Sequence, residues 1–215
     1  MSTAGRVSEI VTRTDSGTWH NLEGSDFLFY FEQDVWTDDL KKLAHDAFDK
    51  AKHLPNLIKN AVANVTGQQV AQGVYLADTK DMATALNSID GLAETGVDTT
   101  SDSGNRDATD ITTRFFGNLL SGLDGDVTKI SGYLTKAMDD FRLQLENSEV
   151  GEFFGTIIGF VSADADIMET ATTLKYVYAT KTEKSWIVSS SCSSHTEFSY
   201  GYEFGNLVYD YDPNL

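Results

Sequence analysis

The sequence predicts a single α+β domain, in which helices cover one antiparallel or mixed sheet that ends in a C-terminal β-meander. Three observations lead to this fold class. A short aromatic run near the N-terminus is typical of a buried strand, the middle of the chain carries apolar residues at helical spacing, and its end is rich in β-forming residues. The order of strand, helices and strands fits one sheet wrapped by helical hairpins.

The first element is expected after a polar segment. Residues 1–25 are polar and weakly patterned, which predicts an N-terminal arm, and residues 26–215 are expected to form the single α+β domain. The run Phe-Leu-Phe-Tyr-Phe at residues 27–31 is bounded by charged residues. Such a run suits a strand that is buried on both faces.

Two helices are expected next. Thr37 is a good helix start, because its hydroxyl can cap free N–H groups and the two aspartates that follow it favour the helix dipole. Apolar residues at helical spacing then predict one buried stripe. Pro55 interrupts the ladder, so a break is expected near Leu54, and a second helical piece ends around Gly67.

A short strand, a helix and a loop are expected in the following segment. Residues 70–76 have the composition of a short strand, and Thr79 opens a helix that ends before Gly91. Residues 97–107 contain almost no apolar side chain, which predicts a surface loop.

Two further helices and an apolar stretch follow. The 3–4 spacing of apolar residues predicts helices at 109–123 and 127–145, and their short link predicts an antiparallel helical hairpin. Residues 153–161 are the most apolar stretch and are interpreted as a central strand or a buried helix. Gly155 and Gly159 in this stretch would then mark the close approach of a neighbouring element.

The end of the chain changes character. Four short β-rich runs are separated by polar segments, at residues 174–178, 186–188, 198–204 and 207–209. This pattern predicts a three- or four-stranded antiparallel meander.

Charge and composition limit the partners and the location. The 33 acidic and 16 basic side chains give a net charge of −17, which repels nucleic-acid phosphates and anionic lipid headgroups. Nucleic acid is therefore not an expected partner, and contact with a membrane would have to be driven by apolar surface. We see neither a secretory signal nor a run of 18 apolar residues. The expected location is the cytoplasm, or the exterior after secretion without a classical signal peptide.

The single cysteine, Cys192, is the main candidate site residue. Alternation along a strand places Trp186, Val188 and Cys192 on one face, which is expected to be the core face, and small serines around the thiol leave volume unfilled. The thiol would then lie in the wall of a cavity, where it would carry an acyl chain or contact an apolar ligand. The alternative is that Cys192 is a small buried hydrophobic residue without further function. His195 falls on the opposite face, which argues against a thiol nucleophile activated by this histidine.

The residues expected to line this cavity are Trp186, Val188, Phe198, Tyr200 and Tyr202.

Common catalytic, phosphate-binding and metal-binding patterns are not found. The sequence contains neither a P-loop nor a dinucleotide fingerprint nor a nucleophile elbow, and its acidic clusters miss the calcium-loop spacing. No catalytic residue, metal or cofactor is predicted, apart from a bound or covalent fatty acyl chain. Asp164 and Asp166 are best explained as turn or cap residues, with the alternative that they donate protons in an enzyme.

The order of elements, together with a lone cysteine in Trp-Ile-Val-Ser-Ser-Ser-Cys at residues 186–192, resembles the Evf virulence factors. It is more distantly similar to the cytolytic Cyt δ-endotoxins. The first resemblance implies a helix-wrapped sheet and a fatty acyl chain, such as palmitate, held as a thioester by Cys192. The second implies a toxin that inserts strands of its sheet into membranes.

Three functions remain from these observations. The leading hypothesis is a non-enzymatic protein that holds a lipid or another apolar ligand in a cavity near Cys192, with toxin-like, membrane-active behaviour. The second is an enzyme, for example a cyclase or isomerase of secondary metabolism, that acts on a hydrophobic small molecule. The third is a protein-interaction module, which an exposed apolar patch without a cavity would favour.

Overall fold

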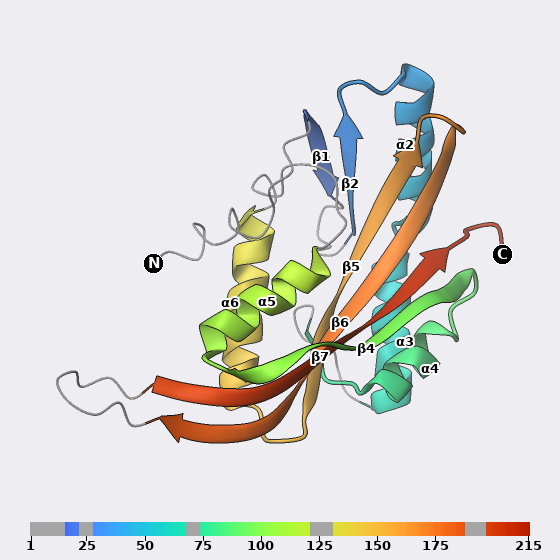
Figure 1. Ribbon diagram of the computed structural model, residues 1–215. Coiled ribbons are helices and arrows are strands. Elements are labelled where there is room, and N and C mark those ends of the chain that lie inside the picture. Colours follow the sequence, from blue (N-terminus) through green and yellow to red (C-terminus); the bar gives the residue numbers. More distant parts are fainter. Residues whose placement is uncertain (1–15, 22–27, 68–73, 121–130, 188–196) are drawn as a thin grey trace.

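The computed structural model describes residues 16–21, 28–67, 74–120, 131–187 and 197–215. Its centre is one sheet with the strand order β1-β2-β5-β6-β7-β4 (Figure 1). These strands are β1 (Gly17–Asn21), β2 (Leu28–Gln33), β5 (Phe153–Asp164), β6 (Glu169–Ile187), β7 (Glu197–Tyr211) and β4 (Leu92–Arg106). The short strand β3 (Val74–Tyr75) pairs with β5 beside this path. Because β2 and β5 run parallel while their neighbours pair antiparallel, the predicted single sheet is a mixed one.

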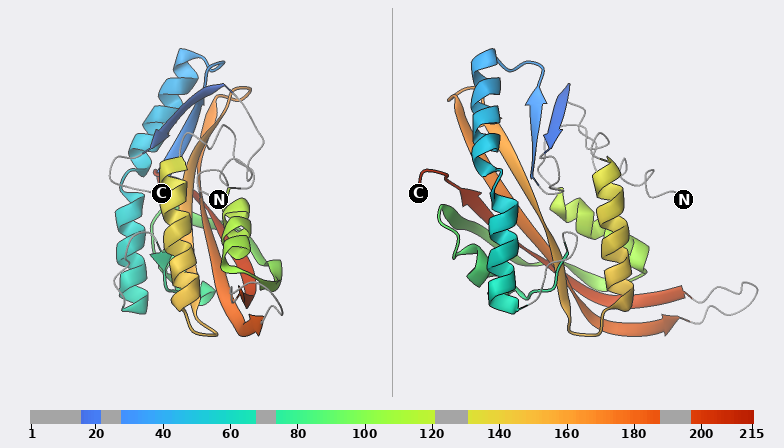
Figure 2. Two further views of the ribbon diagram at one scale, coloured as in Figure 1. Left: turned by 90° about the vertical axis from the view of Figure 1, so that its left-hand side faces the viewer. Right: turned by 180° about the vertical axis from the view of Figure 1, so that it is seen from behind.

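Helices cover both faces of the sheet (Figure 2). One face, which we call the α2–α4 face, carries α2 (Asp38–Ala51), α3 (Leu54–Thr66) and α4 (Thr79–Leu86). The other, the α5–α6 face, carries α5 (Ala108–Leu119) and α6 (Ser131–Asn147). This arrangement confirms the predicted α+β class with helices around one sheet.

Strand β2 shows how one segment serves both cores. Leu28 and Tyr30 belong to the core of the α2–α4 face, and Phe29 between them belongs to the core of the α5–α6 face. All three are buried. The predicted strand with two buried faces is therefore confirmed.

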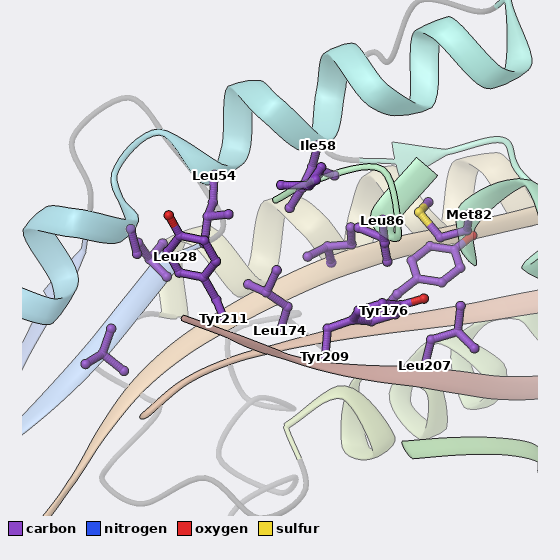
Figure 3. Packing of buried hydrophobic residues seen from close by; sticks show 14 of the residues in the cluster. Leu28, Leu54, Ile58, Met82, Leu86, Leu174, Tyr176, Leu207, Tyr209 and Tyr211 are labelled. Atoms are coloured by element: carbon purple, nitrogen blue, oxygen red, sulfur yellow. The ribbon is translucent and has the colours of Figure 1, made fainter. Parts of the chain in front are cut away.

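The core of the α2–α4 face combines aliphatic helix residues with tyrosines of the sheet. Figure 3 shows Leu54 and Ile58 of α3 next to the side chains of β6 and β7. Tyr176 of β6 is buried there, and its hydroxyl donates to the carbonyl oxygen of Ala77 at 3.0 Å. In the described part of the chain, no helix combines the length and the hydropathy that a membrane crossing requires.

The start of α2 and the break after it follow the sequence. The Thr37 hydroxyl oxygen accepts a hydrogen bond from the N–H of Leu40 at 3.3 Å and caps the helix as predicted. Helix α2 ends at Ala51 and α3 begins at Leu54, which places Pro55 in the first turn of α3. A proline is tolerated there because the first N–H groups of a helix have no partner within it.

The loop predicted at residues 97–107 is wrong. Residues up to Arg106 form β4, which pairs antiparallel with β7 and has register shifts after Glu94 and Asp98. The polar composition suggested a loop, but β4 lies at the edge of the sheet, and its strand conformation comes from hydrogen bonds to β7. Asp107 then caps α5, since its carboxylate accepts from the N–H of Asp110 at 2.8 Å.

The division of the C-terminal meander also differs from the prediction. The runs at 174–178 and 186–188 belong to one strand, β6, and the runs at 198–204 and 207–209 belong to one strand, β7. The polar residues between the runs continue the β6–β7 ladder, with one bulge near Thr182. Together with β5, these strands form an antiparallel meander of three strands.

Two other elements are shorter in the structure than predicted, and part of the predicted helical hairpin lies outside the described residues. Helix α4 stops at Leu86, and β3 comprises two residues of the predicted strand 70–76, of which residues 70–73 lie outside the described residues. The link of the predicted helical hairpin, residues 121–130, also lies outside them. Helices α5 and α6 do contact each other, with the rings of Phe115 and Phe141 centred 3.9 Å apart, and they cross in Figure 1.

Candidate functional site

A pocket of about 380 Å³ lies on the α5–α6 face, next to Leu119, the last residue of α5. Its floor is formed by neighbouring strands, from β1 at one end to β7 at the other. The apolar residues that complete its wall beside the aromatic ones are Leu119, Val161, Ala163 and Val208. A volume of this size falls in the range of small-molecule sites.

Aromatic side chains form one end of this pocket. Trp19 of β1 stands opposite Phe31 of β2, and their ring centroids are 5.2 Å apart. Phe160 of β5 completes this end together with Trp36, from the turn after β2, which also packs into the core of the α2–α4 face. The antiparallel pairing of β1 with β2 and the parallel pairing of β2 with β5 bring these segments together.

Polar side chains form the opposite end. Thr173 and Lys175 come from β6 and Asn206 from β7. Lys175 is half-buried, and its ammonium group donates a hydrogen bond to the carbonyl oxygen of Asn118 near the C-terminal end of α5. Cations are favoured at such a helix end. Lys175 is the only charged residue in the described lining.

A more open hollow of about 590 Å³ adjoins the pocket and shares Gln33, Trp36, Ser162 and Ala163 with it. Next to this hollow, two turns expose apolar side chains. Val35 in the β2–α2 turn is 84% exposed, and Ile167 and Met168 in the β5–β6 turn are 61% and 42% exposed. We call these three residues the apolar tip. Met168 adopts a φ of 53°, a conformation that is uncommon for a residue other than glycine.

The structure describes only part of the predicted site. Val188, Cys192 and His195 lie outside the described residues. Trp186, Phe198 and Tyr200 have described backbones, with Trp186 paired to Phe198, but their side chains lie outside the description.

Tyr202 is the predicted lining residue whose side chain is described. It is 1% exposed and packs on Phe204 in the core of the α5–α6 face, with ring centroids 4.8 Å apart. It does not belong to the lining of the 380 Å³ pocket. Lys175 lies near the start of β6 and Ile187 at its end, so Lys175 and the end of β6 are ~40 Å apart along the strand.

The acidic residues of the enzyme alternative form a turn. The carboxylate of Asp164 accepts hydrogen bonds from the N–H of Asp166 at 2.8 Å and from the N–H of Ile167 at 3.4 Å. Both aspartates are exposed. The carboxylate of Asp164 therefore stabilises the β5–β6 turn, in line with the preferred interpretation of the sequence.

Sequence reasoning missed the residues that line the described pocket. Trp19 lies in the predicted polar arm, where an isolated tryptophan was the available signal. Lys175 is a single charge between Leu174 and Tyr176 in a predicted strand, which indicates a strand face with a polar partner. Neither signal shows that the two residues lie in one pocket. In chain order four strands, β2 to β5, lie between β1 and β6, and the strand order of the sheet brings the two residues to one pocket.

No protein-family model matches this sequence, and no curated protein matches it. Among solved structures, the chain is similar to an activated Cyt2Ba monomer from Bacillus thuringiensis subsp. israelensis, with 10% identity and a TM-score of 0.38 over 86% of this chain and 97% of that one. It is also similar to a delta-endotoxin, with 10% identity and a TM-score of 0.39 over 87% of this chain and 82% of that one. At this level of identity and superposition, the likeness assigns no function. The resemblance to Evf virulence factors stays a prediction.

Proposed function

We propose that the chain is a non-enzymatic binding protein that holds an apolar small molecule or a fatty acyl chain in the pocket on the α5–α6 face. The supporting observation is that Trp19, Phe31, Trp36 and Phe160, from separate segments of the chain, line one volume of about 380 Å³. Trp19 and Phe160 are half-buried, and an apolar ligand beside them would remove their remaining exposed surface from water.

The composition of the lining supports binding rather than catalysis. General acid–base chemistry needs a titratable group within hydrogen-bonding reach of the reacting atoms. The described lining of the pocket contains no carboxylate and no histidine, and its one titratable group, the ammonium of Lys175, donates a hydrogen bond to the carbonyl oxygen of Asn118. Asp164, the acid nearest in sequence to the lining residue Ala163, is engaged in the β5–β6 turn.

Tryptophan fluorescence tests the proposal and locates the ligand. The chain has three tryptophans, Trp19, Trp36 and Trp186. One variant keeps only Trp19, with Trp36→Phe and Trp186→Phe, and a matched variant keeps only Trp186, with Trp19→Phe and Trp36→Phe. Each is titrated with a fatty acid brominated on its chain, because bromine quenches a nearby indole.

We expect saturable quenching in the Trp19 variant and little in the Trp186 variant, since Trp19 lines the pocket. Quenching of Trp186 alone would instead indicate a ligand near Trp186, as the cavity predicted near Cys192 from the sequence requires. If neither variant is quenched and calorimetry with the full chain detects no binding, the proposed function is wrong.

The apolar tip supports a second, membrane-active function. Val35, Ile167 and Met168 are exposed in two turns beside the hollow that adjoins the pocket, and exposed apolar groups of this kind suit contact with a lipid surface. The net charge of −17 opposes anionic lipids, so neutral vesicles are the appropriate target.

Co-sedimentation with phosphatidylcholine vesicles tests this function. The double variant Val35→Asp/Ile167→Asp is compared with Leu143→Asp/Val150→Asp, which makes the same change in charge at two exposed apolar residues away from the tip. Loss of vesicle binding in the first variant and its retention in the second would support the proposal. Equal binding of both variants, or no binding of the unaltered chain, would contradict it.

Acyl attachment at Cys192 remains a separate proposal. The ends of β6 and β7 that flank this residue, Ile187 and Glu197, lie far along the strand from the pocket. Intact mass under non-reducing conditions tests the proposal directly. A mass increment equal to a fatty acyl group that hydroxylamine removes would support it, and the mass of the unmodified chain would rule it out for that preparation.

A further inference from the structure

We infer that the ligand of the pocket is a monocarboxylic acid whose carboxylate lies beside Lys175 and whose apolar body lies among Trp19, Phe31 and Phe160. This inference rests on the proposed function, because it names the chemical class of the molecule in that pocket. It follows from the division of the lining into two ends and from the position of its single charge.

The order of the strands determines which end of the pocket would hold the polar group of the ligand. The aromatic residues of the lining lie mainly on β1, β2 and β5, with the polar residues Gln33 and Ser162 beside them, whereas Lys175, the one charged residue of the described lining, lies on β6. Phe160 on β5 is paired with Thr173 on β6, so the two ends meet at this pair. An amphiphile with one polar group therefore fits with its apolar body across β1 to β5 and its polar group over β6 and β7.

Lys175 supplies the charge that selects an acid. Its neighbours Leu174 and Tyr176 are buried in the core of the α2–α4 face, so alternation directs Lys175 to the α5–α6 face. The carbonyl oxygen of Asn118 holds the ammonium at the edge of the pocket. In this half-buried position the charge is less screened than on the open surface, and a carboxylate beside it gains more.

The charge balance favours one negative charge rather than two. Lys175 is the only charged residue in the described lining, and Thr173 and Asn206 are neutral. A phosphate monoester would bring about two negative charges into a protein with a net charge of −17, and the described lining offers no second cation beside Lys175. A carboxylate matches the single ammonium group.

The test compares two ligands that differ only in the polar group, decanoate and 1-decanol. Their dissociation constants are measured by calorimetry with the full chain. We expect the unaltered chain to bind decanoate more tightly. In Lys175→Gln, the affinity for decanoate should fall about tenfold to a hundredfold, as for the loss of one charge-assisted hydrogen bond, while the affinity for decanol stays within about twofold.

Two further variants separate the charge from other effects. Lys80→Gln makes the same change in net charge at an exposed position of α4, on the other face of the sheet, and should bind both ligands like the unaltered chain. Lys175→Arg keeps the charge and should keep the preference for decanoate. If Lys175→Gln does not fold, the arginine variant and the preference of the unaltered chain decide the question.

The outcomes distinguish this inference from the proposed function. If the unaltered chain binds decanol as tightly as decanoate, or if Lys175→Gln weakens both ligands equally, Lys175 serves only to anchor α5 and the inference is wrong, while the pocket remains a binding site. If neither ligand binds, the proposed function fails as well.

Discussion

At the scale of single residues, Gly155 shows why one position in the central strand is restricted to glycine. A Cβ atom at this position would lie 2.5 Å from the carbonyl oxygen of Val177 and 2.6 Å from the ring of Tyr176. Both belong to β6, the neighbouring strand. The ring of Tyr176 thus occupies the space that any other residue would need, as the sequence led us to expect for this glycine.

We predict that Gly155→Ala destabilises the protein by about 1–3 kcal/mol, because backbone and a buried ring must move to admit one methyl group. Urea denaturation of the variant measures the change. Gly96→Ala in β4 is the matched control, since its Cβ would lie 3.6 Å from Val208, an ordinary contact distance. Equal midpoints for the two variants would show that the sheet relaxes around Tyr176 at little cost.

At the scale of elements, α6 is attached to the sheet by a buried lysine. Lys181 of β6 is 1% exposed, and its ammonium group donates to the carbonyl oxygen of Leu145 at 3.1 Å and to that of Ser148 at 2.6 Å. These carbonyls lie at the C-terminal end of α6, where N–H partners within the helix run out. The positive charge also interacts favourably with the negative end of the helix dipole.

We predict that Lys181→Met lowers the free energy of unfolding by about 2–4 kcal/mol, because it leaves two buried carbonyls without this charged donor. Lys80→Met, at an exposed position, should change stability by less than about 0.5 kcal/mol. Hydrogen exchange should show the largest loss of protection in α6. A uniform loss across the molecule would contradict a specific role in holding this helix.

At the scale of the whole molecule, buried tyrosines make the stability of the fold depend on pH, because the folded state favours their protonated form. Burial raises the pKa of Tyr30 to about 12, with a further contribution from the negative charge of Glu32. Burial also raises the pKa of Tyr75, Tyr176 and Tyr209 above the ordinary value. These residues lie in the same core, between the sheet and α2, α3 and α4.

The sign of the pH dependence follows from these directions. Above pH 10, the ordinary pKa, tyrosines of the unfolded chain lose their protons while the buried ones keep theirs. We therefore predict that the free energy of unfolding is retained below pH 10 and falls as the pH rises from 10 to 12. Urea denaturation at a series of pH values measures this free energy. In the Tyr30→Phe variant it should fall less steeply between pH 10 and 12 than in the unaltered chain. If the free energy of unfolding of this variant falls with pH as steeply as that of the unaltered chain, Tyr30 does not contribute to the pH dependence.

The sequence by itself determined the elements that depend on local patterns. The strand with two buried faces predicted at residues 27–31 corresponds to β2 (Leu28–Gln33), and the capped start of α2 after Thr37 and the break near Leu54 were also predicted. In each case the physical cause lies within a few residues, in the alternation of side chains, a capping hydroxyl or the missing N–H of proline. The order of these elements was also sufficient for the class of one sheet wrapped by helices.

Only the tertiary structure decided which polar segments become strands and where the pocket lies. Strand β4 has little apolar character of its own and is held by its pairing with β7. The pocket joins Trp19 of β1 to Lys175 of β6 and Asn206 of β7. Local propensity carries no information on such contacts, because they depend on strand order and register across the sheet. For the same reason, the sequence pattern pointed to Cys192, whereas the described pocket joins residues of β1, β2, β5, β6 and β7.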